Sequence, residues 1–403
     1  MKKSKVSQFE FIALMAFLMS VVALAIDALL PALDIIGISI GSENPANHQL
    51  LITMIFLGLG LGPLLFGPLS DSLGRKPMIF VGFGIFIIAS FICVYAESIE
   101  IMVLGRVLQG IGLSSPRTIS VAIIRDKYSG DNMAKIMSFV IVIFLLVPII
   151  APALGKLILD FYNWQAIFYM QIGFCLLIAL WFWKRQEETL TDRNRIKFKR
   201  SLFISGFIEL FRYKKTIAYT LVSGFITGSF MVYLSCSQQI FQEQYQLKEA
   251  FPYIFAGLAF SSGLSIILNG IFVVKYGMKK IINFAIIGFF GVSIIYVIMF
   301  FNSPNPTIEI ILTFFAFQFF FLGFLFGNLR SIAMQPLGHI AGIAAAITGF
   351  ISTLMAVPIS IIIGKYVDTT ALPIFIGFSI CSFLSILTLS AIKLKNKYLF
   401  TRI

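Results

Sequence analysis

Charged side chains are scarce in this 403-residue chain, and their scarcity excludes a soluble protein. Only 12% of the residues are Asp, Glu, Lys or Arg, whereas 59% are hydrophobic, and the mean hydropathy is +0.95. Soluble domains carry roughly twice this share of charge. The composition therefore places the chain in a lipid bilayer and leaves little sequence for a soluble catalytic domain.

Histidine and cysteine are rare, and their positions argue against cofactor chemistry. No Cys/His cluster has zinc spacing, and no Gly-x-x-x-x-Gly-Lys-Ser/Thr loop for binding nucleotide phosphates occurs. The cysteines fall in four separate apolar runs, and both histidines lie near run ends: Cys93, Cys175, Cys236, Cys381, His48 and His339. We therefore expect no disulfide framework, no metal or haem, no cofactor, no enzymatic activity and no ATP-driven step; any work must come from an ion gradient.

Long uninterrupted apolar runs predict an all-α membrane protein. A helix needs about 20 residues to cross the hydrocarbon core, and runs such as 78–96 are apolar on every face, unlike the alternating strands of a membrane barrel. We predict twelve transmembrane helices, at 9–33, 49–71, 77–96, 100–124, 133–159, 165–184, 215–238, 250–274, 280–300, 307–334, 340–366 and 371–393.

The basic residues predict the orientation of these helices. The net charge of +13 would suggest nucleic acid for a soluble protein, but here ten basic residues lie between 184 and 215 and most others fall in alternate loops. By the positive-inside rule both termini are cytoplasmic, and no nucleic-acid partner is expected. Lys2, Lys3 and Lys5 precede the first run as in a signal peptide, but no small-residue cleavage site follows, so we interpret the run as a retained helix.

The polar stretch after the sixth run divides the chain into two halves. We expect a six-helix bundle at 1–184, a cytoplasmic linker at 185–214 and a second six-helix bundle at 215–403. A glycine-bounded basic turn recurs 203 residues later, Gly67, Asp71, Gly74 and Lys76 falling opposite Gly270, Val274, Gly277 and Lys279. Two pseudo-symmetric six-helix repeats around a midplane cavity are typical of secondary transporters.

The segment G-P-L-S-D-S-L-G-R-K-P at 67–77 resembles the loop signature of the major facilitator superfamily (MFS). Further segments resemble its drug:proton antiporters of the Bcr/CflA type: Asp27–Pro31, Arg106–Gly110, Arg125–Asp126, Pro148–Gly155 and Ala341–Gly342. The resemblance covers residues 27 to about 364. It implies the MFS fold and a proton-coupled, monomeric exporter of small organic molecules that works by alternating access in the bacterial inner membrane.

The loop signature itself predicts a conformational latch. Gly67 and Gly74 permit close helix approach and a tight turn, and Asp71 can pair with Arg75 beside Lys76. Asp126 can close the charge cluster, and the start of the eleventh helix, near Gly342, is the expected partner for Asp71. The alternative is a basic loop that only sets the orientation of the chain.

Asp27 and Arg106 are the candidates for proton coupling. Asp27 is the only acid deep in a predicted helix, and intramembrane charges are costly enough to indicate function. Arg106 lies at a similar depth, so we expect the two to meet and Asp27 to bind and release a proton. The alternative is a permanent structural ion pair.

Several residues are candidates for lining the substrate cavity. Arg106, Gln109, Leu113 and Arg117 share one helical face, and Arg330 is a further atypical arginine. Together they favour an anionic substrate, unless Arg117 and Arg330 extend to the interface. In the second half the candidates are Phe230, Tyr233, Phe317 and Gln318.

The prolines of the fifth run set the expected direction of transport. In the family that the chain resembles, the motif formed by Pro148, Pro152 and Gly155 marks exporters. The alternative is that these residues form an ordinary packing kink. Two other functions remain open: a dedicated carrier of an organic anion such as a carboxylate siderophore, and a non-transporting membrane sensor or scaffold.

Overall fold

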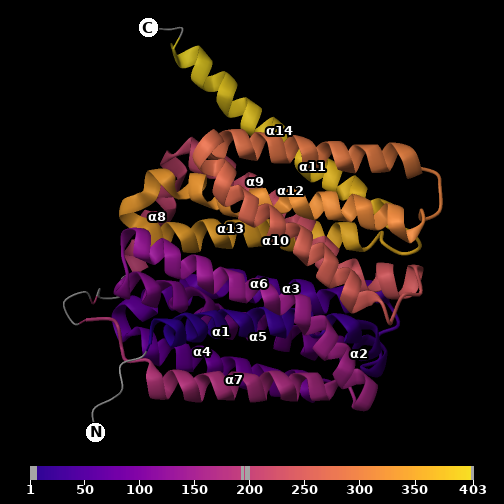
Figure 1. The fold of residues 1–403 in the computed structure, drawn as a ribbon, viewed down its shortest axis with the longest axis horizontal. Helices are drawn as coiled ribbons and strands as arrows, with labels where there is room; N and C mark the ends of the chain where they lie inside the picture. Colours follow the sequence, from indigo (N-terminus) through magenta and orange to yellow (C-terminus); the bar gives the residue numbers. More distant parts are fainter. Residues whose placement is uncertain (1–6, 192–194, 196–199, 401–403) are drawn as a thin grey trace. The chain divides into compact units, whose positions relative to one another are not determined.

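The computed structural model describes residues 7–191, 195 and 200–400, and this part of the chain is almost entirely helical (Figure 1). Twelve of the helices in it are long and apolar enough to cross a membrane, which confirms the predicted number. Lys2, Lys3 and Lys5, which contribute to the predicted cytoplasmic position of the amino terminus, lie outside the described residues. The chain divides into two compact units, Met1–Lys199 and Arg200–Ile403, with six of these helices in each.

The described part of the first unit contains eight helical segments in chain order. They are α1 (Gln8–Asp27), the 3-10 turn η1 (Leu30–Ala32), α2 (Leu33–Ser39), α3 (Pro45–Leu73), α4 (Arg75–Val94), α5 (Ile99–Lys127), α6 (Gly130–Phe161) and α7 (Gln165–Arg185). Side chains cap the amino ends of two of the long helices: Asn44 Oδ1 accepts from the Ala46 amide of α3, and Ser98 Oγ accepts from the Ile101 amide of α5. Such caps satisfy amides that have no partner within the helix.

Helix α5 forms the centre of the first unit. It packs against α3, α4 and α1, while α6 covers another side of α1. Along α5 the buried positions include polar as well as apolar side chains, among them Arg106, Gln109 and Ser115. Buried polar groups need hydrogen-bond partners, so the packing around α5 creates the sites described below.

The first membrane-spanning segment differs from the prediction, which treated 9–33 as one continuous helix. Helix α1 ends at Asp27, and the chain resumes helical structure only at η1 and α2. Pro31 explains the break, because a proline ring clashes with the carbonyl four residues earlier, here that of Asp27, and proline has no amide hydrogen to donate. The deep aspartate therefore stands at the carboxyl end of a helix rather than in its middle.

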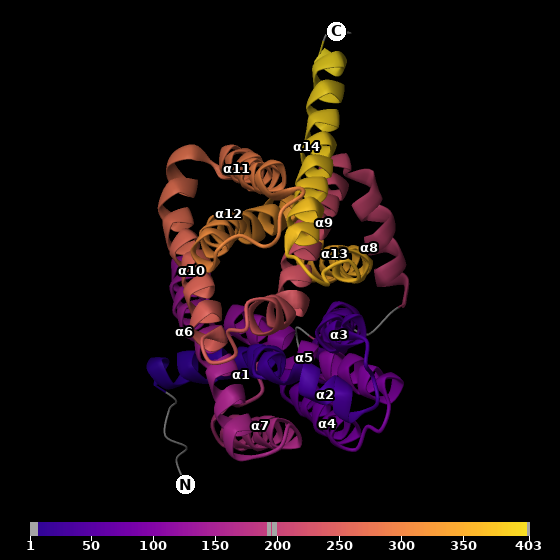
Figure 2. The same cartoon turned by 90° about the vertical axis from the view of Figure 1, so that its right-hand side faces the viewer.

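The second unit begins with a helix in the segment predicted to be a polar linker. Its elements are α8 (Arg200–Arg212), α9 (Lys214–Gln238), the π-helical η3 (Gln239–Gln244), α10 (Phe251–Tyr276), α11 (Met278–Phe300), α12 (Ile308–Met334), the 3-10 turn η4 (Gln335–Ile340), α13 (Ala341–Gly364) and α14 (Leu372–Phe400). Helix α9 packs against α13, α14 and α12 (Figure 2). Aromatic rings fill much of this core, including Phe315 against Phe375 and Tyr233 against Phe319.

Candidate functional site

Asp27 lies at the break in the first membrane-spanning segment and is nearly buried. Its residue surface is 5% exposed. Within the part of the chain that the structure describes, its carboxyl group has no hydrogen-bond or ion-pair partner. The backbone next to it is tightly packed, because Gly155 of α6 lies against the carbonyl of Ala28, where an added Cβ would approach the oxygen to 2.0 Å.

The motif predicted in the fifth apolar run lies on α6, and through Gly155 it reaches the break beside Asp27. Helix α6 contacts both α1 and η1, and Pro152 and Gly155 are buried on it while Pro148 is half-buried. Only a residue without a side chain allows two helix backbones to approach this closely. Gly155 thus connects the motif to the position of the aspartate.

Arg106 is fully buried on α5, but its hydrogen bonds go to backbone carbonyls rather than to Asp27. Nε donates to Leu51 O of α3 at 2.7 Å, and Nη1 and Nη2 donate to Ala25 O of α1 at 3.2 and 3.1 Å. Nη1 also donates to Gln109 Oε1 at 2.7 Å. The structure thus does not form the predicted ion pair: the guanidinium is bonded two residues before Asp27, to the main chain, and joins α1, α3 and α5.

Gln109 extends this network from α5 to α4. Its Nε2 donates to Ser90 Oγ at 2.7 Å, and that hydroxyl donates to Phe86 O at 2.7 Å. The side chains from Arg106 to Ser90 therefore form a continuous chain of hydrogen bonds that ends on a backbone carbonyl. The arrangement holds α1, α3, α4 and α5 in one register around the break.

The second unit repeats this arrangement without the arginine. Gln318 of α12 donates to Ser293 Oγ of α11 at 2.7 Å, and Ser293 donates to Phe289 O at 2.7 Å. Ser90 and Ser293 are 203 residues apart in the sequence, which is the spacing of the repeated turn. Phe315, three residues before Gln318, stands where Arg106 stands before Gln109. In consequence the buried Gln318 Oε1 has no hydrogen-bond partner among the described residues.

The candidates for the substrate cavity do not share one environment. Tyr233 is fully buried with its ring against Phe255, Phe315 and Phe319, and Gln318 is used between α12 and α11. Both therefore serve helix packing in this structure rather than lining an open cavity. The two were predicted from their chemistry, and the helical face that each occupies was not evident from the sequence.

The remaining cavity candidates lie at different depths. Leu113 is fully buried on α5, whereas Arg117, one turn further on, is exposed. Arg330 on α12 and Phe317 are exposed as well, and Phe230 is half-buried against Phe319 and Phe326. Of the face predicted on α5, only the first three residues are enclosed by the first unit.

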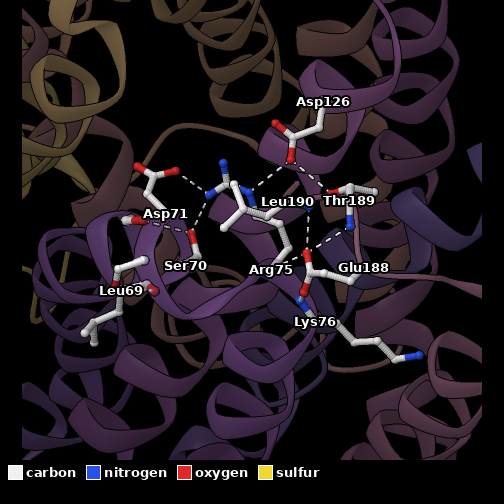
Figure 3. Close-up of polar contacts among 11 residues, drawn as sticks. Leu69, Ser70, Asp71, Arg75, Lys76, Asp126, Glu188, Thr189 and Leu190 are labelled. Carbon is white, nitrogen blue, oxygen red and sulfur yellow. Dashed lines mark hydrogen bonds and ion pairs between the residues drawn. The ribbon is translucent and has the colours of Figure 1, made fainter. Parts of the chain in front are cut away.

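The predicted latch residues come together at the junction of α3 and α4 (Figure 3). Arg75 is 4% exposed and pairs with Asp71 (Nη1–Oδ1, 2.5 Å) and with Asp126 at the end of α5 (Nε–Oδ2, 3.1 Å). It also donates to Ser70 Oγ at 2.7 Å. One buried guanidinium thus joins the end of α3 and the end of α5 through two carboxylates, a charge-assisted arrangement that is strong for hydrogen bonds.

Glu188, which the sequence analysis missed, completes this cluster from the segment after α7. Its carboxylate accepts from the amides of Arg75 at 3.1 Å and Lys76 at 2.9 Å, the first two residues of α4. It also accepts from the amides of Thr189 and Leu190, each at 2.8 Å. The acid therefore caps the amino end of α4, where amides lack helical partners and negative charge is favoured.

Two further contacts fix the 186–190 segment beside α4. Thr189 Oγ1 donates to Asp126 Oδ2 at 3.0 Å, and Lys76 Nζ donates to the carbonyls of Trp183 at 2.8 Å and Gln186 at 2.7 Å. Gly74 makes room for Glu188: its φ is +114°, and a Cβ there would lie 2.8 Å from Glu188 Oε2. Gly67 makes no comparable close contact, since an added Cβ would meet no atom within 4 Å.

The corresponding turn of the second unit keeps the backbone and the lysine but lacks the acid and the arginine. Gly277 between α10 and α11 has φ of +78°, as the repeat predicts. Val274 and Met278 stand where Asp71 and Arg75 stand in the first unit, and Val274 is 87% exposed. The ion-pair cluster is therefore a property of the first unit. Among the described residues there is also no group of three metal-ligating side chains.

Comparison with known proteins agrees with this geometry. A model of the Major Facilitator Superfamily matches residues 12–357. Over 374 residues the chain is 30% identical to the uncharacterized MFS-type transporter YdgK of Bacillus subtilis (strain 168), covering 89% of this chain and 90% of that protein. It is 25% identical over 399 residues to a bicyclomycin resistance protein homolog of Haemophilus influenzae, covering 94% and 95%.

Other relatives match a smaller part of the chain or only the fold. The multidrug resistance protein MdtL of Klebsiella pneumoniae (strain 342) is 34% identical over 155 residues, 38% of this chain and 39% of that protein. The crystal structure of a single-residue mutant of the nucleoside transporter NupG superposes with a TM-score of 0.74 at 13% identity, covering 95% and 99%. That of the human organic anion transporter MFSD10 has a TM-score of 0.63 at 14% identity, covering 94% and 98%.

These matches confirm that the sequence resembles the Major Facilitator Superfamily over most of its length. The relatives named for bicyclomycin and multidrug resistance agree with the Bcr/CflA branch of that family. This multi-pass membrane protein, which is a transporter and not an enzyme, belongs to the Major Facilitator Superfamily.

Proposed function

We propose that this transporter exports small organic molecules by alternating access in a bacterial cytoplasmic membrane, acts as a monomer, and is driven by protons that move in the opposite direction. The relatives named for bicyclomycin and multidrug resistance support drug-like substrates. The observation that carries the proposal is Asp27, a nearly buried carboxyl without a counter-ion among the described residues, at the break of a membrane-spanning helix.

The break places Asp27 at a point where the backbone departs from regular helix, as in many coupling sites of transporters. Discontinuous membrane helices place coupling sites where the backbone departs from helical structure. A carboxyl group carries a proton across a membrane only if its access to water changes during the cycle, and a helix end moves more readily than a helix centre. The position of Asp27 at the end of α1, against α6 through Gly155, supports this assignment.

Arg106 supports this function as a positioning residue in our proposal. Its guanidinium carries a permanent charge, and its bonds to Ala25 O hold the last turn of α1 two residues before Asp27. The guanidinium is thus bonded to the main chain two residues before Asp27 and does not pair with its carboxyl. These backbone contacts keep the break in place.

We propose that the Arg75 cluster acts as a latch of the first unit. Its carboxylates and guanidinium join the ends of α3, α4, α5 and the 186–190 segment on one side. Packed elements with two discrete arrangements are the usual components of transport switches. In this view the cluster closes in one state of the cycle and loosens in the other.

Substrate accumulation in inverted membrane vesicles tests the proposal. A fluorescent amphipathic drug serves as substrate and an imposed pH gradient as the energy source. Asp27→Asn should abolish gradient-driven accumulation while substrate exchange without a gradient remains. Asp34→Asn is the matched control, since Asp34 lies on α2 of the same segment and pairs with His48 at 3.1 Å; it should retain accumulation. Gradient-driven accumulation by Asp27→Asn would contradict the proposal.

A second candidate, a dedicated carrier of organic anions such as a carboxylate siderophore, is favoured by the exposed Arg117 on α5. An arginine holds a carboxylate through two parallel charge-assisted bonds, whose loss costs about 1.5–3 kcal/mol, or roughly tenfold to a hundredfold in affinity. Arg117→Ala should weaken binding of a polycarboxylate by this factor and leave lipophilic cations unaffected, with Arg117→Lys intermediate. If neither variant changes either affinity, this candidate is wrong. A non-transporting sensor, the candidate from another class, would show no counterflow in proteoliposomes.

A further inference from the structure

Helix α8 has an inner face that docks on the second unit. Gly206 lies against α13, where an added Cβ would approach Ile343 Cγ2 to 2.7 Å and Ile347 Cδ1 to 3.2 Å. Leu210, one helical turn later, is 1% exposed. Residues four apart share a face of a helix, so Gly206 and Leu210 define the side of α8 that packs on the transmembrane bundle.

The opposite face of α8 is apolar and exposed. Ile208 is 56% exposed and Phe211, three residues later, is 61% exposed. In Figures 1 and 2, α8 lies across the end of α13 rather than alongside it. A helix in this orientation runs in the plane of a membrane surface, with one face toward the bundle and the other away from it.

Three exposed basic residues follow this apolar face directly. Arg212 is the last residue of α8, and Lys214 and Lys215 open α9, a membrane-spanning helix. Tyr213, between them, is 37% exposed. Because one residue separates α8 from a membrane span, the lipid headgroups are within reach of all these side chains. Glu209 is the acid on the described part of α8, so the local charge is positive.

We propose that α8 is an interfacial helix that binds the anionic lipid surface of the cytoplasmic leaflet. Ile208 and Phe211 enter the boundary of the acyl region, and Arg212, Lys214 and Lys215 bind lipid phosphates. Apolar side chains beside a basic cluster are the combination that anchors amphipathic helices to anionic membranes. The distribution of basic residues places this side of the chain in the cytoplasm. Through Gly206 the lipid surface would then hold the beginning of α13.

A local quenching measurement on the full-length protein in liposomes tests this proposal. A fluorophore is attached to Phe211→Cys, or to Ile208→Cys if the first variant folds poorly; all four native cysteines are buried. Nitroxide-labelled phosphatidylglycerol or phosphatidylcholine is added at equal mole fraction as quencher. Each basic residue near an anionic membrane surface contributes about 1 kcal/mol, which corresponds to about a fivefold preference for the anionic lipid. Labelled phosphatidylglycerol should therefore quench the fluorophore at least about fivefold more effectively than labelled phosphatidylcholine.

The control variants isolate the contribution of α8. The triple variant Arg212→Gln, Lys214→Gln and Lys215→Gln should lower the quenching ratio to about one. The triple variant Lys275→Gln, Lys279→Gln and Lys280→Gln removes the same charge at the α10–α11 turn, on the same side of the second unit, and should leave the ratio unchanged. Equal quenching by both lipids in the unmodified chain would overturn the proposal, and so would quenching by neither, which would mean that protein or water covers this face.

Discussion

At the scale of single residues, the two units differ most at Arg106 and its counterpart Phe315. Both units keep the glutamine, the serine and the backbone carbonyl of the network, at Gln109 and Gln318 respectively. Only the network of the first unit includes an arginine: Nη1 of Arg106 donates a hydrogen bond to Oε1 of Gln109 at 2.7 Å. The same oxygen of Gln318 has no partner among the described residues. The internal repeat thus retains the packing and confines the charge to the unit that carries Asp27.

Paired substitutions of the two glutamines should therefore have unequal effects. Gln109→Leu leaves a donor of the buried Arg106 without its partner, and hydrogen bonds to charged groups contribute about 1.5–3 kcal/mol. Gln318→Leu removes the donor to Ser293 and an acceptor that has no partner among the described residues, so it should cost only the loss of a neutral hydrogen bond, about 0.5–1.5 kcal/mol. Thermal unfolding of the purified variants measures the difference. Equal losses would show that the charge does not strengthen the network in the first unit.

The sequence indicated some of these residues and could not indicate how they are used. Asp27 and Arg106 were identified because charge is expensive at their depth in a membrane. Their pairing was predicted from equal depth alone, and depth does not say which way a side chain points. Arg106 donates to backbone carbonyls because Pro31 ends α1 early and the neighbouring helices approach closely. Both conditions arise only in the folded chain.

At the scale of elements, the break in the first membrane-spanning segment depends on the approach of α6. Gly155 touches the carbonyl of Ala28, directly after Asp27. The contact is between two backbones, so neither partner can rotate away from an added side chain. Gly155 of the predicted motif and Asp27 therefore belong to one structural feature.

Gly155→Ala should move α6 away from the break. Overpacking of this kind costs about 1–3 kcal/mol, and transport should fall more steeply than stability because the displacement is centred on Asp27. Gly173→Ala on α7 is the matched control, since an added Cβ there meets no atom within 4 Å. Unfolding temperature and substrate efflux are measured for both. A Gly155 variant with unchanged efflux would show that the close approach is ordinary packing.

At the turn between α3 and α4, Gly74 has a positive φ. The carboxylate of Glu188 accepts a hydrogen bond from the amide of Arg75, which lies 113 residues earlier in the sequence. The glycines at this turn were evident from the sequence, and the positive φ of Gly74 and Gly277 agrees with the predicted repeat. Glu188 was not evident, because a capping acid in a polar segment looks the same as any solvated acid. Helix α8 was missed for a related reason, since its apolar residues stand within the most basic stretch of the chain.

Gly74→Ala and Gly277→Ala should separate the contribution of the positive φ from that of the Glu188 cap. Both substitutions force a side chain into a positive φ with an extended ψ, a backbone region used almost only by glycine, at a cost of about 1–3 kcal/mol. Only Gly74→Ala also displaces Glu188, whose Oε2 would lie 2.8 Å from the new Cβ. We expect the larger loss of thermal stability for Gly74→Ala, and Glu188→Gln should reproduce the additional part. If the two alanine variants are equally stable, the Glu188 cap contributes nothing measurable.

At the scale of the whole molecule, the buried charged groups are distributed unequally between the two units. The latch cluster, the buried arginine and the deep aspartate all belong to the first unit, while the second unit has Val274, Met278 and Phe315 at the corresponding positions. The second unit instead contains packing surfaces rich in aromatic side chains. The twelve-helix fold was predictable because membrane spans depend on composition and length, which are local properties. Which polar groups meet within each unit depends on contacts between helices, so it was not evident from the sequence.

Proton movement during transport is the most direct test of the central claim. Purified protein is reconstituted in liposomes that contain a pH-sensitive dye, and a substrate gradient is applied with no initial pH gradient. We predict that substrate flow drives protons in the opposite direction in the unmodified protein, and that Asp27→Asn moves substrate without moving protons. Substrate-driven proton flux that is undiminished in Asp27→Asn would contradict the assignment of coupling to this residue, and substrate flow without any proton flux in the unmodified protein would contradict proton coupling itself.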